Sequence, residues 1–171
     1  VARVVLGNAL AASRRYEEAI AHLREGITVL EGIGALEVQP EAQQILGRIL
    51  LECGMSEEGR YHLERGLALA QQVGDRLQKA IILRHTARLL ADNGQLNEAF
   101  STLDQAMALS SELGGKLETA RATMLAAELR QRSGDWQTAE RLANQALAMF
   151  NQLGARIDQQ YAADWLAMRA G

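Results

Sequence analysis

The chain has 171 residues, of which 48% are hydrophobic and only 4% aromatic, so its core must be built mainly from aliphatic side chains. Its 18 Lys and Arg residues against 21 Asp and Glu residues give a net charge of −3, which offers no overall attraction to nucleic acid or an anionic membrane. The single cysteine, Cys53, excludes an internal disulfide, and no apolar run approaches the roughly 20 residues that a membrane span needs. We therefore expect a soluble, cytoplasmic protein without a signal peptide. Because the sequence opens at Val1 already inside a helical pattern, we also expect it to be part of a longer chain.

The composition favours Ala, Leu, Glu, Gln and Arg, which are good helix formers, and includes only one proline, so it predicts an all-α fold. Apolar residues at spacings of three and four indicate helices with one buried side. In chain order they predict helices at 2–13, 16–33, 39–53, 56–73, 76–93, 95–113, 116–133, 135–153 and 156–169. Between residues 34 and 40 we expect an irregular stretch, with Pro40 in the first turn of the following helix.

Two series of glycines recur with a period of 40 residues. The first series consists of Gly34, Gly74, Gly114 and Gly154, and the second of Gly54, Gly94 and Gly134. A helix readily ends at a residue in the left-handed conformation, where a Cβ is unfavourable, so each glycine marks a helix end. Two helix ends per period indicate two helices per repeat.

Small residues recur with the same period. They are Gly7, Gly47, Ala87, Ala127 and Ala167 on the first helices, and Ala19, Gly59, Ala99 and Ala139 on the second helices. Because small side chains let helix axes approach closely, we expect the pairs to pack tightly. A single helix pair cannot bury its apolar face alone, whereas stacked pairs form a continuous core. We therefore predict one domain over 1–171, with repeats at 1–34, 35–74, 75–114 and 115–154, and with 155–171 as a capping helix or a truncated fifth repeat.

The recurring segments resemble the tetratricopeptide repeat family. The residues that carry the resemblance are Leu6-Gly7 and Leu46-Gly47 on first helices, and Gly134-Asp135-Trp136-Gln137-Thr138-Ala139-Glu140 at a turn, echoed by Arg14-Arg15-Tyr16-Glu17-Glu18-Ala19 and Gly94-Gln95-Leu96-Asn97-Glu98-Ala99. The period of 40 exceeds the family's commoner 34, and glycine replaces the closing proline. This long-period form is similar to repeats of bacterial multidomain signalling ATPases and transcription activators. The resemblance implies a right-handed α-solenoid, or superhelix, of antiparallel helix pairs that binds partners and performs no chemistry, with no cofactor and no metal.

The resemblance places the partner-binding residues on the inward stripe of the first helices. By position these residues are Asn8, Gln44, Arg48, Arg84, Arg88, Arg121, Met124, Glu128 and Arg132. In the middle of the stripe, Arg48, Arg84 and Arg88 should lie near one another, and guanidinium groups suit carboxylates, so we predict an acidic peptide or helix as ligand.

A plainer interpretation of the stripe stays open. Arg48 and Glu52, Arg88 and Asp92, and Glu128 and Arg132 are each four residues apart, which is the spacing of intrahelical ion pairs on a solvated helix face.

Other notable residues point to packing or association rather than chemistry. Tyr161 and Trp165, four apart on the last helix, could cover the end of the core, dock a further helix, or mediate self-association. His22 and His62 are 40 residues apart without a third ligand at metal spacing, so we predict no metal site. Cys53 occupies a turn position filled elsewhere by Ser13, Asn93 and Ser133, and we interpret it as a small turn residue rather than a nucleophile.

Two functions remain as hypotheses. The first is a protein-interaction scaffold that binds a peptide or helix of a partner, with no direct role for nucleic acid or membrane, and with a homo-oligomer through the terminal helix as an option. The alternative is a sensory domain of a larger bacterial signalling ATPase or transcription regulator, which binds a small ligand or signal peptide and transmits a change of curvature. Neither hypothesis requires an enzyme.

Overall fold

The computed structural model describes residues 1–168 and is helical throughout this part, with no β-strand in it. The elements are α1 (Ala2–Ala12), α2 (Tyr16–Gly32), a short 3₁₀ helix η1 (Leu36–Val38), α3 (Gln39–Glu52), α4 (Ser56–Val73), α5 (Arg76–Asp92), α6 (Leu96–Glu112), α7 (Lys116–Arg132), α8 (Trp136–Leu153) and α9 (Arg156–Ala167). The all-α class is confirmed, and the first eight predicted α-helices agree with the structure to within one residue at each end. The predicted ninth helix includes residue 169, which lies outside the described residues.

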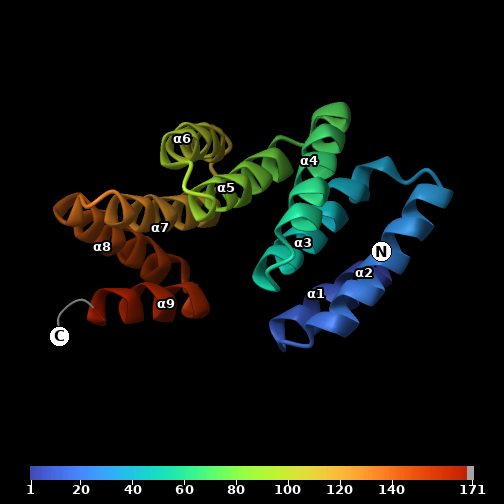
Figure 1. Cartoon of the computed structure of the whole chain (residues 1–171), viewed down its shortest axis with the longest axis horizontal. Helices are drawn as coiled ribbons and strands as arrows, with labels where there is room; N and C mark the ends of the chain where they lie inside the picture. The colour runs from blue at the N-terminus through green and yellow to red at the C-terminus, as the bar shows by residue number, and fades with distance from the viewer. Residues whose placement is uncertain (169–171) are drawn as a thin grey trace. The chain divides into compact units, whose positions relative to one another are not determined.

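The helices form two compact units, Val1–Leu89 and Leu90–Gly171, with the boundary inside α5. In the first unit α1 packs on α2, α2 on α3, and α3 on α4; in the second, α6 packs on α7, α7 on α8, and α8 on α9. Figure 1 shows α1 with α2, and α3 with α4, as hairpins joined by tight turns, whereas a longer stretch that contains η1 joins α2 to α3. The predicted sequential antiparallel pairs are thus confirmed, while the single domain and the right-handed superhelix stay predictions.

The turns end the helices as the glycine series predicts. All seven glycines of the two series have a left-handed backbone, with φ between 65° and 84°. The α1–α2 turn is different, because its left-handed residue is Arg14, with φ 59°. Arg14 is the only residue other than glycine with a positive φ among those described.

The core of the first unit is aliphatic, with Leu23, Leu30, Leu46 and Leu50 almost completely buried. The small residues allow close packing at one point in particular, where α3 crosses α4. A Cβ added to Gly47 would lie 3.0 Å from the carbonyl oxygen of Gly59, which leaves no room for a side chain without a shift.

The core of the second unit is built largely on alanine. Ala120, Ala127, Ala139, Ala143, Ala146 and Ala162 are all completely buried. Phe150, Met124 and Trp165 fill the space that these small side chains leave. Trp165 brings α9 into this cluster, so the last helix is part of the packed unit.

The irregular stretch between α2 and α3 is confirmed. It contains η1, and Pro40 stands in the first turn of α3, where its missing N–H costs no helical hydrogen bond. The buried side chain of Gln39 donates to the carbonyl oxygen of Leu30 at 3.3 Å, which ties the start of α3 to the end of α2.

None of the helices within residues 1–168 has the length and apolar character that would let it cross a membrane.

Candidate functional site

In the first unit, polar side chains of the first helices form a connected network centred on Arg48 of α3. Its Nη2 donates to Oδ1 of Asn8 on α1 at 3.2 Å, and its Nη1 donates to Oε1 of Glu52 at 2.7 Å. The Arg48 side chain is 27% exposed. These two contacts hold the Arg48 side chain in place. Because a guanidinium carries five N–H donors, others are left for a ligand.

A separate polar contact joins α3 to α4. Gln44 is buried, and its neighbour Gln43 accepts a hydrogen bond from Nδ1 of His62 at 2.6 Å. Gln44 therefore presents little surface, whereas Arg48 presents its guanidinium.

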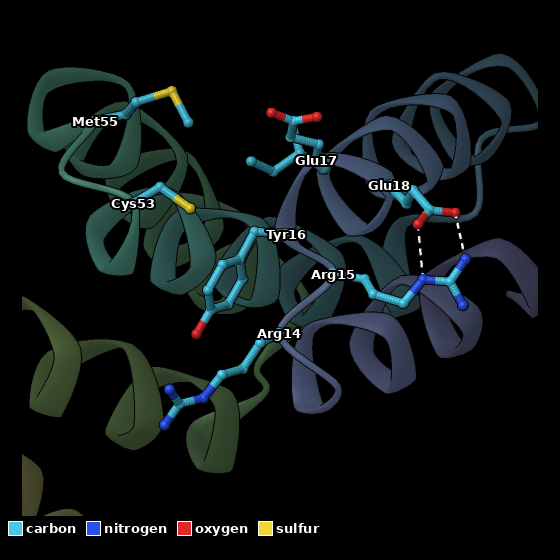
Figure 2. Close-up of a pocket in the computed structure, with 8 residues that line it drawn as sticks. Arg14, Arg15, Tyr16, Glu17, Glu18, Cys53 and Met55 are labelled. Carbon is cyan, nitrogen blue, oxygen red and sulfur yellow. Dashed lines mark hydrogen bonds and ion pairs between the residues drawn. The ribbon is translucent and has the colours of Figure 1, made fainter.

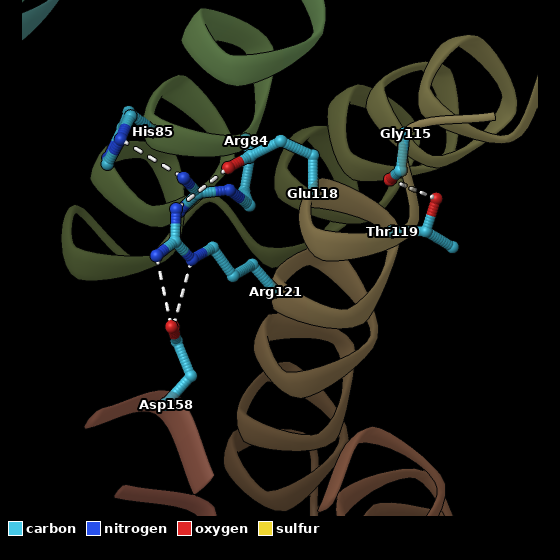
Figure 3. Close-up of polar contacts among 7 residues, drawn as sticks. All are labelled: Arg84, His85, Gly115, Glu118, Thr119, Arg121 and Asp158. Atoms are coloured by element: carbon cyan, nitrogen blue, oxygen red, sulfur yellow. Dashed lines mark hydrogen bonds and ion pairs between the residues drawn. The ribbon is translucent and has the colours of Figure 1, made fainter. Parts of the chain in front are cut away.

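Arg84 and Arg88 lie on the part of α5 that belongs to the first unit, and both are half-buried. Nη2 of Arg84 lies 3.3 Å from Nε2 of His85, which fits an arginine N–H donating to a neutral imidazole (Figure 3). Both arginines are engaged in polar interactions, so they are fixed rather than mobile cations.

In the second unit, Arg121 of α7 is held by two carboxylates. Its Nε and Nη2 donate to Oδ1 and Oδ2 of Asp158 on α9 at 2.9 and 3.0 Å, and its Nη1 donates to Oε1 of Glu118 at 3.0 Å (Figure 3). The hydrogen bonds with Asp158 raise the pKa of the Arg121 guanidinium, and burial opposes this effect. Arg121 thus serves mainly to join α7 to α9.

Further polar contacts join successive first helices in the second unit. The hydroxyl of Tyr161 on α9 donates to Oε1 of Glu128 on α7 at 2.9 Å. Nη1 of Arg132 lies 2.7 Å from Oδ1 of Asp92, at the end of α5. Glu128 is buried, whereas Arg132 is exposed.

Two predicted residues contribute little surface. Met124, predicted to line the groove, is 3% exposed and packs in the apolar cluster of the second unit. Trp165, predicted at the end of the core, lies in the same cluster, while Tyr161 beside it keeps about half of its surface exposed. The whole set of predicted site residues stays a prediction, but Met124 offers a partner almost nothing to contact.

The charge on the first-helix stripe differs between the units. In the first unit the stripe carries three arginines, Arg48, Arg84 and Arg88, of which Arg48 forms an ion pair with Glu52. In the second unit Arg121 and Arg132 stand with Glu118, Glu128, Asp158 and Asp92, so the stripe is acidic.

The solvated-face interpretation is correct for one pair, because Arg48 and Glu52 do form an intrahelical ion pair. Arg132 instead pairs with Asp92 on the preceding first helix. The stripe is thus partly a set of crosslinks between helices, which the four-residue spacings did not predict.

Residues that could support chemistry are not assembled into a site. Within residues 1–168 no three His, Cys, Asp or Glu side chains are placed to share a metal ion. Burial, together with the charge of Glu52, raises the pKa of the Cys53 thiol, so the nucleophilic thiolate is disfavoured at neutral pH.

A surface depression that sequence reasoning missed lies between the α1–α2 and α3–α4 turns. It has a volume of about 520 Å³ and is lined by Arg14, Arg15, Tyr16, Glu17, Glu18, Ile20, Cys53 and Met55 (Figure 2). The sequence held a signal for it, because Arg14 stands 40 residues before Gly54 and so interrupts the second glycine series. We call this depression the turn pocket.

Comparison with known proteins agrees with this architecture. Residues 85–152, which are 68 of the 171, match the tetratricopeptide repeat family. The crystal structure of BtubC (BKLC) from P. vanneervenii superimposes with a TM-score of 0.71 over 97% of this chain and 77% of that one, at 13% identity. A structure of nearly identical TPR-like repeats from a Podosopora anserina protein assigned as a kinesin light chain gives a TM-score of 0.68 over 99% of this chain and 87% of that one, at 18% identity.

No curated protein matches the sequence. At identities below one in five, the structural likeness concerns the fold, a tetratricopeptide-like arrangement of helical repeats. The narrower resemblance to bacterial signalling and regulatory proteins stays a prediction.

Proposed function

We propose that this chain is a non-catalytic protein-interaction domain, and that its first unit holds an acidic segment of a partner against the basic stripe of Arg48, Arg84 and Arg88. Tetratricopeptide repeats generally bind proteins, and residues 85–152 match that family. The ligand class comes from the residues of this chain rather than from its relatives.

The observation that carries the proposal is the way Arg48 is held. Asn8 from α1 and Glu52 from α3 fix its guanidinium at the surface while using only part of its donor capacity. A fixed arginine loses little side-chain entropy when a carboxylate binds, and guanidinium groups can bind carboxylates through two parallel hydrogen bonds. Arg84 and Arg88 add two further guanidinium groups on the same unit.

The experiment uses a fluorescently labelled peptide of alternating Glu and Leu residues, with the matched Gln and Leu peptide as the uncharged control. Fluorescence anisotropy with the 171-residue chain should show binding of the Glu peptide that weakens as salt rises, since screening acts on exposed charge pairs. We expect Arg84→Glu to weaken binding about tenfold, which corresponds to about 1.4 kcal/mol.

A control variant carries the same charge change elsewhere in the first unit. Arg65 is exposed on α4, a second helix, so Arg65→Glu should leave the Kd within about twofold, as expected for a distant surface charge. Circular dichroism and urea unfolding of each variant report whether the fold is intact. Equal binding by Arg84→Glu and the original chain, or equal binding of the Glu and Gln peptides, would remove the case for this stripe.

A further inference from the structure

The first turn of the chain carries an arginine where the structure favours glycine. Arg14 has φ 59°, a left-handed conformation that residues with a Cβ adopt at an energetic cost. The equivalent turns have Gly54, Gly94 and Gly134 at this position. A long, charged side chain at a strained position in a regular repeat is a reason to look for a function.

The turn itself does not need the arginine. The N–H of Arg14 donates to the carbonyl oxygen of Ala11 at 2.9 Å, just as the N–H of Gly54 donates to Leu51 at 3.0 Å. A Cβ added to Gly54 would meet nothing within 4 Å, so this turn position faces open space. The strain at Arg14 therefore gains no backbone hydrogen bond over the glycine turns.

The side chain of Arg14 lies at the turn pocket, together with Tyr16. Figure 2 shows the Arg14 guanidinium and the Tyr16 hydroxyl directed to the same side of the turn. Neither side chain has a hydrogen bond or ion pair with any other residue that the structure describes, so both keep their donors for a ligand. The Tyr16 ring packs against the core of the first unit, which anchors it.

On the side of the turn where the Arg14 guanidinium and the Tyr16 hydroxyl lie, the charge of Arg14 is not cancelled by the other charged residues of the turn pocket. Arg15 is neutralised by Glu18, with Nε and Nη2 donating to its two carboxylate oxygens at 2.7 and 2.6 Å. Glu17 lies on the opposite side of the Tyr16 ring from Arg14 in Figure 2. Apolar atoms of Ile20 and Met55 line the same depression.

We propose that the turn pocket is a second contact for a partner peptide, which takes an acidic residue flanked by an apolar one. The carboxylate accepts hydrogen bonds from the Arg14 guanidinium and the Tyr16 hydroxyl, and the apolar side chain covers Ile20 and Met55. This inference rests on the proposed peptide-binding function, but it concerns the turns rather than the first-helix stripe.

The probe is the blocked peptide acetyl-Leu-Glu-Leu-amide, whose only charge is the glutamate, compared with acetyl-Leu-Gln-Leu-amide. Proton–nitrogen correlation NMR of the labelled chain should show saturable shifts at residues 14–16 and 53–55 with the Glu peptide. A ligand of this size is expected to bind with a Kd on the order of 1 mM, so the titration extends to about 10 mM. The Gln peptide should give no saturable shifts there.

Three variants separate binding from folding. Arg14→Gly should abolish saturation while its urea midpoint stays the same or rises, because the turn then has the residue its conformation favours. Tyr16→Phe should weaken binding severalfold. Arg65→Gln, the control, should bind as tightly as the original chain, because Arg65 is exposed on α4 and does not line the turn pocket.

The same spectra separate this inference from the proposed function. Shifts confined to Asn8 and Arg48 would contradict binding at the turn pocket and support binding at the stripe. Shifts confined to residues 14–16 and 53–55 would support binding at the turn pocket and contradict binding at the stripe. Undiminished binding by Arg14→Gly, equal shifts with the Gln peptide, or no saturable shifts at the turn pocket would each overturn the inference.

Discussion

Arg121 and Asp158 form a two-pronged ion pair that joins α7 to α9, with nitrogen–oxygen distances of 2.9 and 3.0 Å. Glu118 accepts a third hydrogen bond from the same guanidinium. Three of the five N–H donors of Arg121 are therefore used within the second unit. Although its sequence position suggested a partner-binding residue, its geometry is that of a crosslink that holds the last helix in register.

We expect this crosslink to contribute measurably to stability. A double-mutant cycle with Arg121→Met and Asp158→Asn, followed by urea unfolding, should give a coupling free energy of about 1 kcal/mol, which is below the value for a buried pair because Arg121 is 36% exposed. The cycle is needed because each single variant also leaves its partner unpaired.

The matched comparison is Arg132 and Asp92, which also join successive first helices but through a single contact at 2.7 Å, in which Asp92 is 51% exposed against 22% for Asp158. The cycle with Arg132→Met and Asp92→Asn should give about 0–0.5 kcal/mol, as is typical of surface pairs. Equal coupling energies for the two pairs would show that the two-pronged geometry and partial burial add nothing.

The close approach of α3 and α4 predicts a second effect, at Gly59. A Cβ there would lie 2.7 Å from Cδ2 of Leu51 and 3.0 Å from the carbonyl oxygen of Gly47. We expect Gly59→Ala to lower the free energy of unfolding by about 1–3 kcal/mol through overpacking, although alanine is intrinsically the better helix former.

Gly32 is the control, because it lies near the end of α2 and a Cβ there would meet nothing within 4 Å. Gly32→Ala should raise the free energy of unfolding by about 0.5–1 kcal/mol. Urea unfolding followed by circular dichroism compares both variants. Stabilisation by both would mean that the α3–α4 contact relaxes without cost.

The sequence predicted the helices well for a physical reason: the period of 40 marks every helix end with a glycine, and each of these glycines does adopt the left-handed conformation. It also predicted that Gly59 must be small. It did not predict the partners of Arg121 and Arg132, because those contacts join different helices and depend on how successive repeats stack. The four-residue spacing shows only neighbours on the same helix.

The glycine series did not predict the turn pocket, because the pocket lies at the α1–α2 turn, where Arg14 stands in place of glycine. Arg14 fits the repeat in register and departs from it in residue type. Met124 shows the opposite error, since its register suggested the groove while its side chain packs into the core. Register alone does not determine which neighbouring positions of a helix are covered by the next one.

The two aromatic residues of α9 should behave differently when truncated. Trp165 lies in the apolar cluster of the second unit, so Trp165→Ala should cost about 3 kcal/mol of unfolding free energy. Tyr161 is 48% exposed, so Tyr161→Phe loses little more than its hydrogen bond with Glu128, about 0.5–1.5 kcal/mol.

Sedimentation velocity at several concentrations tests self-association through the same helix. If α9 mediates it, Ile157→Asp should shift the chain toward the monomer, because Ile157 is 88% exposed and contributes little to the fold. Concentration-independent sedimentation of the original chain would rule out this route.

His62 predicts how stability depends on pH. Its ring is partly buried, with Nδ1 2.6 Å from Oε1 of Gln43, and burial lowers its pKa below the ordinary 6.5. Glu58, 3.8 Å from Nε2, opposes this shift, and Arg24 adds to it. Just below pH 6.5 the His62 side chain binds a proton in the unfolded chain but not in the folded chain. The contribution of His62 to the free energy of unfolding is therefore full above pH 6.5 and is lost as the pH falls toward the pKa of the folded state.

We therefore expect the unfolding free energy of the original chain to fall between about pH 7.5 and 5.5 by more than that of His62→Gln. The carboxylates titrate in both proteins, so the difference between their two urea-derived stability curves isolates the histidine. That difference should shrink as the pH falls, because the protonated ring loses its advantage in the fold while glutamine does not titrate. Parallel curves across this range, or a difference that grows on acidification, would show that the burial of His62 does not disfavour its charge.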